Sequence, residues 1–122
     1  MPENVWRVTL DTLQIAKDAG IKIGAGTDSG GPCTPHNSIF GELELLVSNG
    51  FSAMEAIISA TQINAEVLGI SEIGLLEKGK LADLIAVEGD PLANIKALSR
   101  VKMVLKKGKE ILKNSEIFSR VG

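Results

Sequence analysis

The stretch Ile21-Lys22-Ile23-Gly24-Ala25-Gly26-Thr27-Asp28-Ser29-Gly30 decides how this chain is interpreted. Its first half is short and starts with β-branched residues, which predicts a strand over 21–26. The next ten residues, 27–36, contain two Gly and two Pro and therefore predict a loop. Asp28 is thus expected in a loop, directly after a strand.

Helical patterns flank this predicted strand on both sides. Apolar residues recur every three or four positions over 4–18 and again over 37–49, which predicts two helices. A third helix is predicted over 52–69, because Ser52 and Glu55 have the spacing of a capping box. The order helix, strand, helix is typical of parallel α/β folds. The buried face of the third helix is expected to consist of Met54, Ile57, Ile58, Thr61, Ala65 and Leu68.

Beyond residue 70 the pattern changes to short strands. They are predicted at 73–77, 82–87 and 101–106, and Gly108-Lys109 is expected to form a turn after the last one. One parallel strand cannot bury both of its faces, and a few short strands make only a partial sheet. The sequence therefore predicts an α/β fold that is a fragment of something larger.

Composition limits the function further. The 122 residues include 13 Lys or Arg and 15 Asp or Glu, with a net charge of −2, which argues against a nucleic-acid partner. No apolar run approaches the roughly 20 residues of a membrane span, and the first residues do not resemble a signal peptide, so a cytoplasmic location is expected. A single His and a single Cys exclude a His-rich metal centre made by this chain alone.

Several motifs together resemble one protein family. Gly26-Thr27-Asp28-Ser29-Gly30, then Pro35-His36, then Glu42-Leu43 look like the final barrel strand of the metal-dependent amidohydrolases and the residues that follow it. The likeness is strongest to the imidazolonepropionase-like and Xaa-Pro dipeptidase (prolidase)-like members, and it covers roughly residues 5 to 112 of the chain. The second half follows the family's C-terminal pattern in order and spacing, with Ala60-Thr61, Asn64-Ala65, Leu68-Gly69, Ile73-Gly74, Gly79-Lys80-Leu81-Ala82-Asp83-Leu84 and Gly89-Asp90-Pro91-Leu92.

The resemblance implies an architecture and a chemistry. Residues 1–69 would be the last helix–strand–helix portion of a (β/α)8 barrel, and residues 70–122 would be the C-terminal share of a small β-sandwich. In the family a divalent metal, usually zinc, is held by several His and by an Asp on the eighth strand, which matches Asp28. That carboxylate would bind the metal and accept a proton during hydrolysis of a C–N bond in an amide, a dipeptide or a cyclic amide. His36 would contact the small-molecule substrate.

Departures from the family pattern limit these expectations. The chain has no His-x-His pair and nothing that matches the family before the seventh helix of the barrel. We therefore expect it to hold metal poorly, to be inactive alone, and to associate with the missing N-terminal part or with itself. Plainer interpretations stay open, with Asp28 as a turn or cap carboxylate, His36 as a solvated loop residue and Cys33 as a loop thiol. The alternative for the whole chain is a small self-associating α/β protein without enzyme activity.

Overall fold

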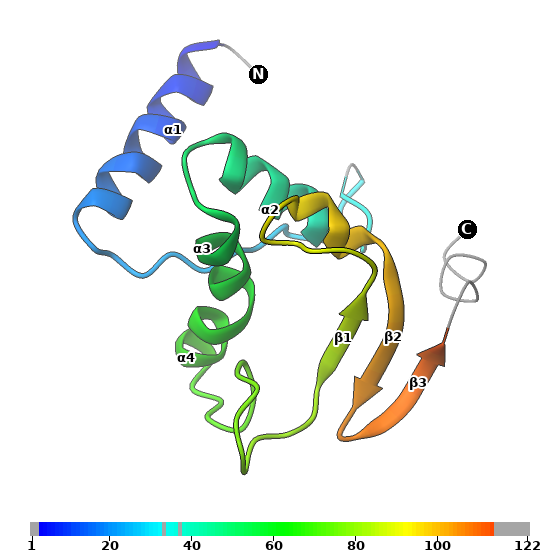
Figure 1. Cartoon of the computed structure of the whole chain (residues 1–122). Coiled ribbons are helices and arrows are strands. Elements are labelled where there is room, and N and C mark those ends of the chain that lie inside the picture. The colour runs from blue at the N-terminus through cyan, green and yellow to red at the C-terminus, as the bar shows by residue number, and fades with distance from the viewer. Residues whose placement is uncertain (1–2, 33, 37, 114–122) are drawn as a thin grey trace.

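A computed structural model describes residues 3–32, 34–36 and 38–113. It shows a helical part and an antiparallel sheet, connected at one end by a short 3-10 helix, η2 (Figure 1). No helix in the described ranges is long and apolar enough to cross a bilayer. In chain order the elements are α1 (Glu3–Asp18), α2 (Ile39–Ser48), α3 (Ala53–Ile58), the π-helical turn η1 (Ser59–Ile63), α4 (Asn64–Leu68), β1 (Leu84–Val87), η2 (Ile95–Ser99), β2 (Val101–Lys106) and β3 (Lys109–Lys113).

The predicted helices are present, with the predicted ends. Gly20 follows α1 with a φ of +71°, and the Ile21 N–H donates to the Ala16 carbonyl at 3.0 Å, as in a Schellman motif. The capping box at the start of α3 is complete, since Glu55 N–H donates to Ser52 Oγ at 3.1 Å and Ser52 N–H donates to Glu55 Oε2 at 2.7 Å.

The third helix differs from the prediction in its middle. One helical run extends from α3 through η1 to α4, but η1 is a π turn, which the sequence did not predict. Ala65 of the expected buried face is buried, whereas Met54 and Leu68 are 48% and 68% exposed. The wider turn breaks the 3.6-residue period, so Leu68, which follows it, no longer continues the face expected from the residues before it. Met54 precedes the turn, so its exposure does not have this cause.

The predicted strand at 21–26 is not present. Residues 21–28 have no regular secondary structure and run between α1 and α2 behind α3 (Figure 1). A strand exists only when a neighbour completes its hydrogen-bond ladder, and none of the three observed strands pairs with this segment. The portion of the chain expected to be a barrel is therefore helical and irregular here.

The sheet has the order β1-β2-β3 and is antiparallel throughout. β1 and β2 confirm the predictions for 82–87 and 101–106, but residues 73–75 form a bend and residues 76 and 77 have no regular structure, so no strand is present at 73–77. β3 was missed. It pairs with β2 through a two-residue turn, Lys107-Gly108, in which φ is +51° and +76°; such positive angles at both central residues are typical of a type I′ hairpin.

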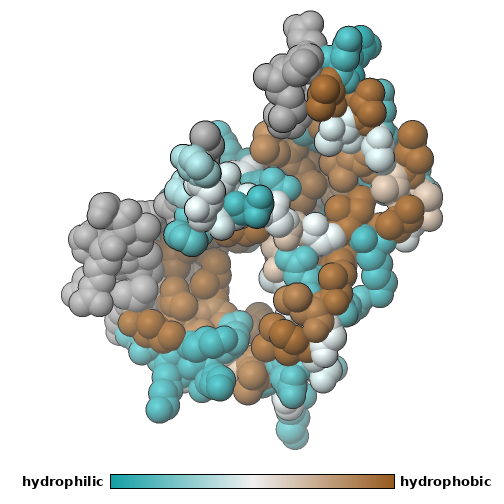
Figure 2. Space-filling view, turned by 180° about the vertical axis from the view of Figure 1, so that it is seen from behind, coloured by the Kyte–Doolittle hydropathy of each residue, from teal (hydrophilic) through white to brown (hydrophobic). Residues whose placement is uncertain are grey.

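The core is small and lies among the helices. Its buried apolar residues come from the segment before Asp28, from α2, from the connection between α2 and α3, from α3 and from η2. Figure 2 shows an opening between the sheet and helices α3 and α4, with apolar surface on its sides. The buried members of the core cluster are Ala25, Leu43, Leu46, Phe51, Ala56 and Ile95.

Candidate functional site

Asp28 lies in an exposed turn between the irregular segment and the loop that precedes α2. Its φ is +49°, a left-handed conformation that costs non-glycine residues energy and that Asp tolerates better than most. The hydroxyls of Thr27 and Ser29 on either side of it are hydrogen-bonded to each other, and Ser29 Oγ is 3.2 Å from Ser38 Oγ. The turn that carries the carboxylate is thereby tied to the start of α2.

His36 lies at the other end of the same loop and is exposed. The loop closes on itself, because the Gly30 N–H donates to the Thr34 carbonyl at 2.9 Å. The imidazole lies over Gly30, where an added Cβ would be 3.3 Å from His36 Cε1. The structure therefore places His36 beside the Asp28 turn. Cys33 lies outside the described residues.

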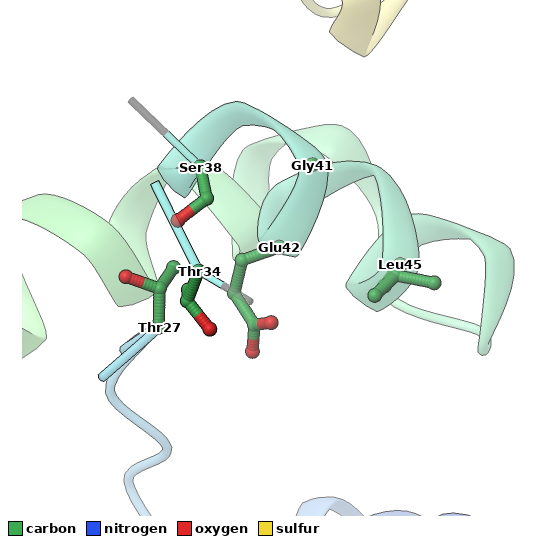
Figure 3. Close-up of a pocket in the computed structure, with 6 residues that line it drawn as sticks. All are labelled: Thr27, Thr34, Ser38, Gly41, Glu42 and Leu45. Atoms are coloured by element: carbon green, nitrogen blue, oxygen red, sulfur yellow. The ribbon is translucent and has the colours of Figure 1, made fainter. Parts of the chain in front are cut away.

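A shallow, open pocket of about 390 Å³ adjoins this turn. One of its lining residues is Glu42, which the sequence analysis named only as part of a motif. Burial raises the pKa of Glu42 above its usual range, because a carboxylate loses hydration there. Figure 3 shows the Thr34 hydroxyl and the Glu42 carboxylate directed to the same side, with Leu45 farther along α2. The pocket is lined by Thr27, Thr34, Ser38, Gly41, Glu42 and Leu45.

The segment before Asp28 is held by the helix α3–η1–α4. Ala25 N–H donates to the Ser59 carbonyl at 3.2 Å, and Asn64 Nδ2 donates to the Ala25 carbonyl at 2.8 Å. Sequence reasoning missed both contacts, although Asn64 was part of a quoted motif. An added Cβ at Gly24 would be 2.3 Å from Asn64 Oδ1, whereas an added Cβ at Gly26 would meet nothing within 4 Å.

The residues described here do not by themselves fit a catalytic metal. Within ranges 3–32, 34–36 and 38–113, no group of three or more His, Cys, Asp or Glu side chains comes together. A catalytic zinc uses three protein ligands and an open position. Asp28 can supply one carboxylate to such a site, but the described residues do not bring further ligands to it.

Comparison with known proteins identifies the family. The family model described as "Amidohydrolase family" matches residues 2–111. No curated protein matches the chain. Among solved structures, a Xaa-Pro dipeptidase with bound methionine in its active site is 42% identical, with a TM-score of 0.78 over 86% of this chain.

Two further structures are similar. A Bifidobacterium longum protein assigned as a prolidase is 42% identical, with a TM-score of 0.76 over 80% of this chain. Phenylurea hydrolase B is 34% identical, with a TM-score of 0.61 over 67% of this chain. The matched region covers 25%, 25% and 18% of these three structures, so the chain spans about a quarter of the length of the first two. With a family match over nearly its whole length, the chain belongs to the amidohydrolase family.

Proposed function

We propose that this chain supplies the Asp28-bearing quarter of a metal-dependent hydrolase of C–N bonds. The observation that carries the proposal is the position of Asp28, which stands exposed at a turn next to a pocket, inside a match of 2–111 to the amidohydrolase family. In this proposal residues 1–69 correspond to the end of the barrel and residues 70–122 to the C-terminal share of the sandwich.

Asp28 is proposed as one metal ligand and as the proton acceptor of the reaction. Its turn is tied to α2 by the Ser29–Ser38 contact and approached by the loop that carries His36, which suits a residue that must keep a fixed direction. His36, exposed next to this turn, is proposed to contact the substrate. The other ligands belong to the part of the fold that relatives have and this chain does not contain.

The proposed substrates are small amides, with dipeptides first. Two similar structures are described as a Xaa-Pro dipeptidase and as a prolidase, and a third as a phenylurea hydrolase. Peptide and urea substrates share an acyl carbon bonded to nitrogen, so we propose that bond as the one cleaved. The pocket lined by Thr27, Thr34 and Glu42 offers hydroxyl and carboxyl groups that can bind polar parts of such a substrate.

The test is reconstitution with the missing part. The chain is co-expressed with the polypeptide encoded immediately upstream, and the purified complex is assayed for bound zinc and for hydrolysis of Xaa-Pro dipeptides. We expect activity that Asp28→Asn lowers by about 100-fold or more, because removing a ligating carboxylate disrupts both affinity and chemistry. Asp11→Asn, which changes an exposed carboxylate on α1, serves as the control and should keep full activity. Full activity of Asp28→Asn would contradict the proposal.

The competing function is that of a self-associating protein without enzyme activity. It is favoured by the many apolar side chains that the described part of the chain leaves exposed, which a second copy could cover. In that case no upstream polypeptide would copurify with the chain, no zinc would be retained, and the chain alone would form defined oligomers. We favour the hydrolase, because the match to the amidohydrolase family covers residues 2–111, including Asp28, and self-association alone does not account for that match.

A further inference from the structure

The helix α3–η1–α4 bonds directly to the segment that leads to Asp28. Ala25, three residues before Asp28, is 9% exposed, and both of its backbone polar groups bond to this helix. Buried backbone groups must find partners, and in a sheet they would find them on a neighbouring strand. Here the Ser59 carbonyl and the Asn64 carboxamide provide them.

The π turn brings these two groups to the same place. η1 begins at Ser59 and is followed at once by Asn64, the first residue of α4. π turns within α-helices are rare and occur often at functional sites, since they move a carbonyl or a side chain out of the regular pattern. Ser59 is itself almost fully buried, at 1% exposure, so this part of the helix lies directly against the segment.

Gly24 is the matching feature on the other side of the contact. Its φ is not positive, so no conformational demand requires glycine there. Space is the reason, because a Cβ at this position would be 2.3 Å from Asn64 Oδ1. A Cβ at position 24 would require the carboxamide to shift, and we expect this shift to weaken its hydrogen bond to the Ala25 carbonyl. Gly24 and Asn64 therefore act as one unit.

We propose that Asn64 is a positioning residue for Asp28, which it orients by holding the Ala25 carbonyl, with Gly24 making room for its side chain. Ala25 is buried in the core, whereas Gly26 is exposed and an added Cβ there would meet nothing within 4 Å. The position of Ala25 therefore decides where the Asp28 turn begins. The part of this inference that concerns the reaction rests on the proposed role of Asp28; the contact itself does not.

The first experiment uses NMR on the isotope-labelled 122-residue chain. Asn64→Ala and Gly24→Ala should each speed exchange of the Ala25 amide by at least about tenfold and shift the backbone signals of Asp28. Their effects should not add in the double variant, because Gly24→Ala has nothing left to displace once the carboxamide is gone. Gln62→Ala, on the same helix but bonded to Glu66, is the control and should leave these signals unchanged.

Asn64→Asp covers the case in which Asn64→Ala does not fold. It keeps the size of the side chain but replaces the donor with a carboxylate oxygen, so it should give the same shifts at Asp28. Additive effects of the two alanine variants, or an Ala25 amide that exchanges in Asn64→Asp as it does in Gln62→Ala, would overturn the inference.

The second experiment separates this inference from the proposed function. In the reconstituted complex, Asn64→Asp should lower kcat for dipeptide hydrolysis by about 10- to 100-fold and leave KM nearly unchanged, because orientation and not substrate binding is lost. A variant that merely destabilised the protein would instead lower the active fraction, which zinc content and circular dichroism would detect. If Asp28→Asn retains activity, the proposed function fails while the contact stands; if only Asn64→Asp retains full kcat, the positioning role fails.

Discussion

Asp83 is the residue whose role the structure explains most directly. The sequence marked it only as part of a motif, but the structure shows that it holds the β2–β3 turn, since Lys107 N–H donates to Asp83 Oδ1 at 2.7 Å and Lys106 Nζ pairs with the other oxygen. The hydrogen bond from the Lys106 side chain, followed by that from the Lys107 backbone, lowers the pKa of Asp83. One carboxylate just before β1 thus fixes the hairpin that follows β2.

Asp83→Asn should lower the free energy of unfolding at neutral pH, and this difference from the unchanged protein should disappear at acidic pH. A lowered folded pKa means that the carboxylate stabilises the fold above its ordinary pKa of about 3.9 and that this contribution is lost as pH falls through the folded value. Thermal unfolding of both proteins from pH 7 down to about pH 2 measures the difference, which should shrink below about pH 4.

Glu88→Gln is the matched control for this prediction. Glu88 pairs with Lys102 at 2.6 Å, but its side chain is 60% exposed, against 19% for Asp83. Exposed ion pairs contribute little, so this variant should lose less stability at pH 7 than Asp83→Asn. If both variants lost the same stability at pH 7, the contact of Asp83 with the β2–β3 turn would contribute no more than an exposed ion pair, which would contradict the prediction.

At the scale of elements, replacing glycine by alanine is expected to change stability in opposite directions at two positions. Gly108 in the β2–β3 turn has a φ of +76°, and a Cβ there would only touch Ala82 Cβ at 4.0 Å. Gly108→Ala should therefore cost about 1 kcal/mol, from backbone conformation alone. Gly41 lies inside α2 with nothing within 4 Å of an added Cβ, so Gly41→Ala should stabilise by up to about 1 kcal/mol.

Chemical denaturation of both glycine variants checks this pair of expectations. Because the substitution is identical, its effect on the unfolded chain is similar in both places, and the opposite signs must come from the folded state. Destabilisation by Gly41→Ala would mean that α2 is packed more tightly at this position than the structure shows.

At the scale of the whole molecule, too much apolar surface is exposed. The accessible surface is 8674 Å², whereas a compact monomer of 12.9 kDa should expose roughly 6,300 Å². Among the described residues, eight apolar side chains are buried and fifteen large ones are exposed. Soluble monomers rarely expose large apolar patches, so we expect other protein to cover part of this surface.

The chain alone should self-associate, partly through α1. Val5, Val8 and Ile15 lie on one face of this helix and are 46%, 64% and 68% exposed. Sedimentation velocity should show concentration-dependent association that Val8→Gln with Ile15→Gln weakens. The control Gln14→Ala, at an exposed position on another face of α1, should not weaken it. A monomer at all concentrations would contradict this, and loss of self-association in the presence of the upstream polypeptide would show that both compete for the same face.

Much of the local structure could be read from local patterns. Ser52 with Glu55 predicted a helix start, and Gly20 predicted a helix end, because caps depend on residues a few positions apart. Asp28 could be selected because its motif is local as well. The prediction of a strand at 21–26 was wrong, because the apolar residues of this segment favour burial but cannot supply the neighbouring strand that a sheet requires. The π turn could not be predicted either, because the spacing of apolar residues does not show that one turn of the helix contains an additional residue.

The sequence by itself determined the helices, two of the three strands, the membership in the amidohydrolase family and the choice of Asp28 as candidate. Only the tertiary structure decided that Ala25 is held by Ser59 and Asn64, that Gly24 makes room for this contact, and that Asp83 holds a distant turn. The physical reason is the separation along the chain between the residues that interact. Propensity, capping and motifs act between residues close in the chain, whereas these contacts join residues 24 to 40 positions apart, and such pairs are fixed only when the whole chain has packed.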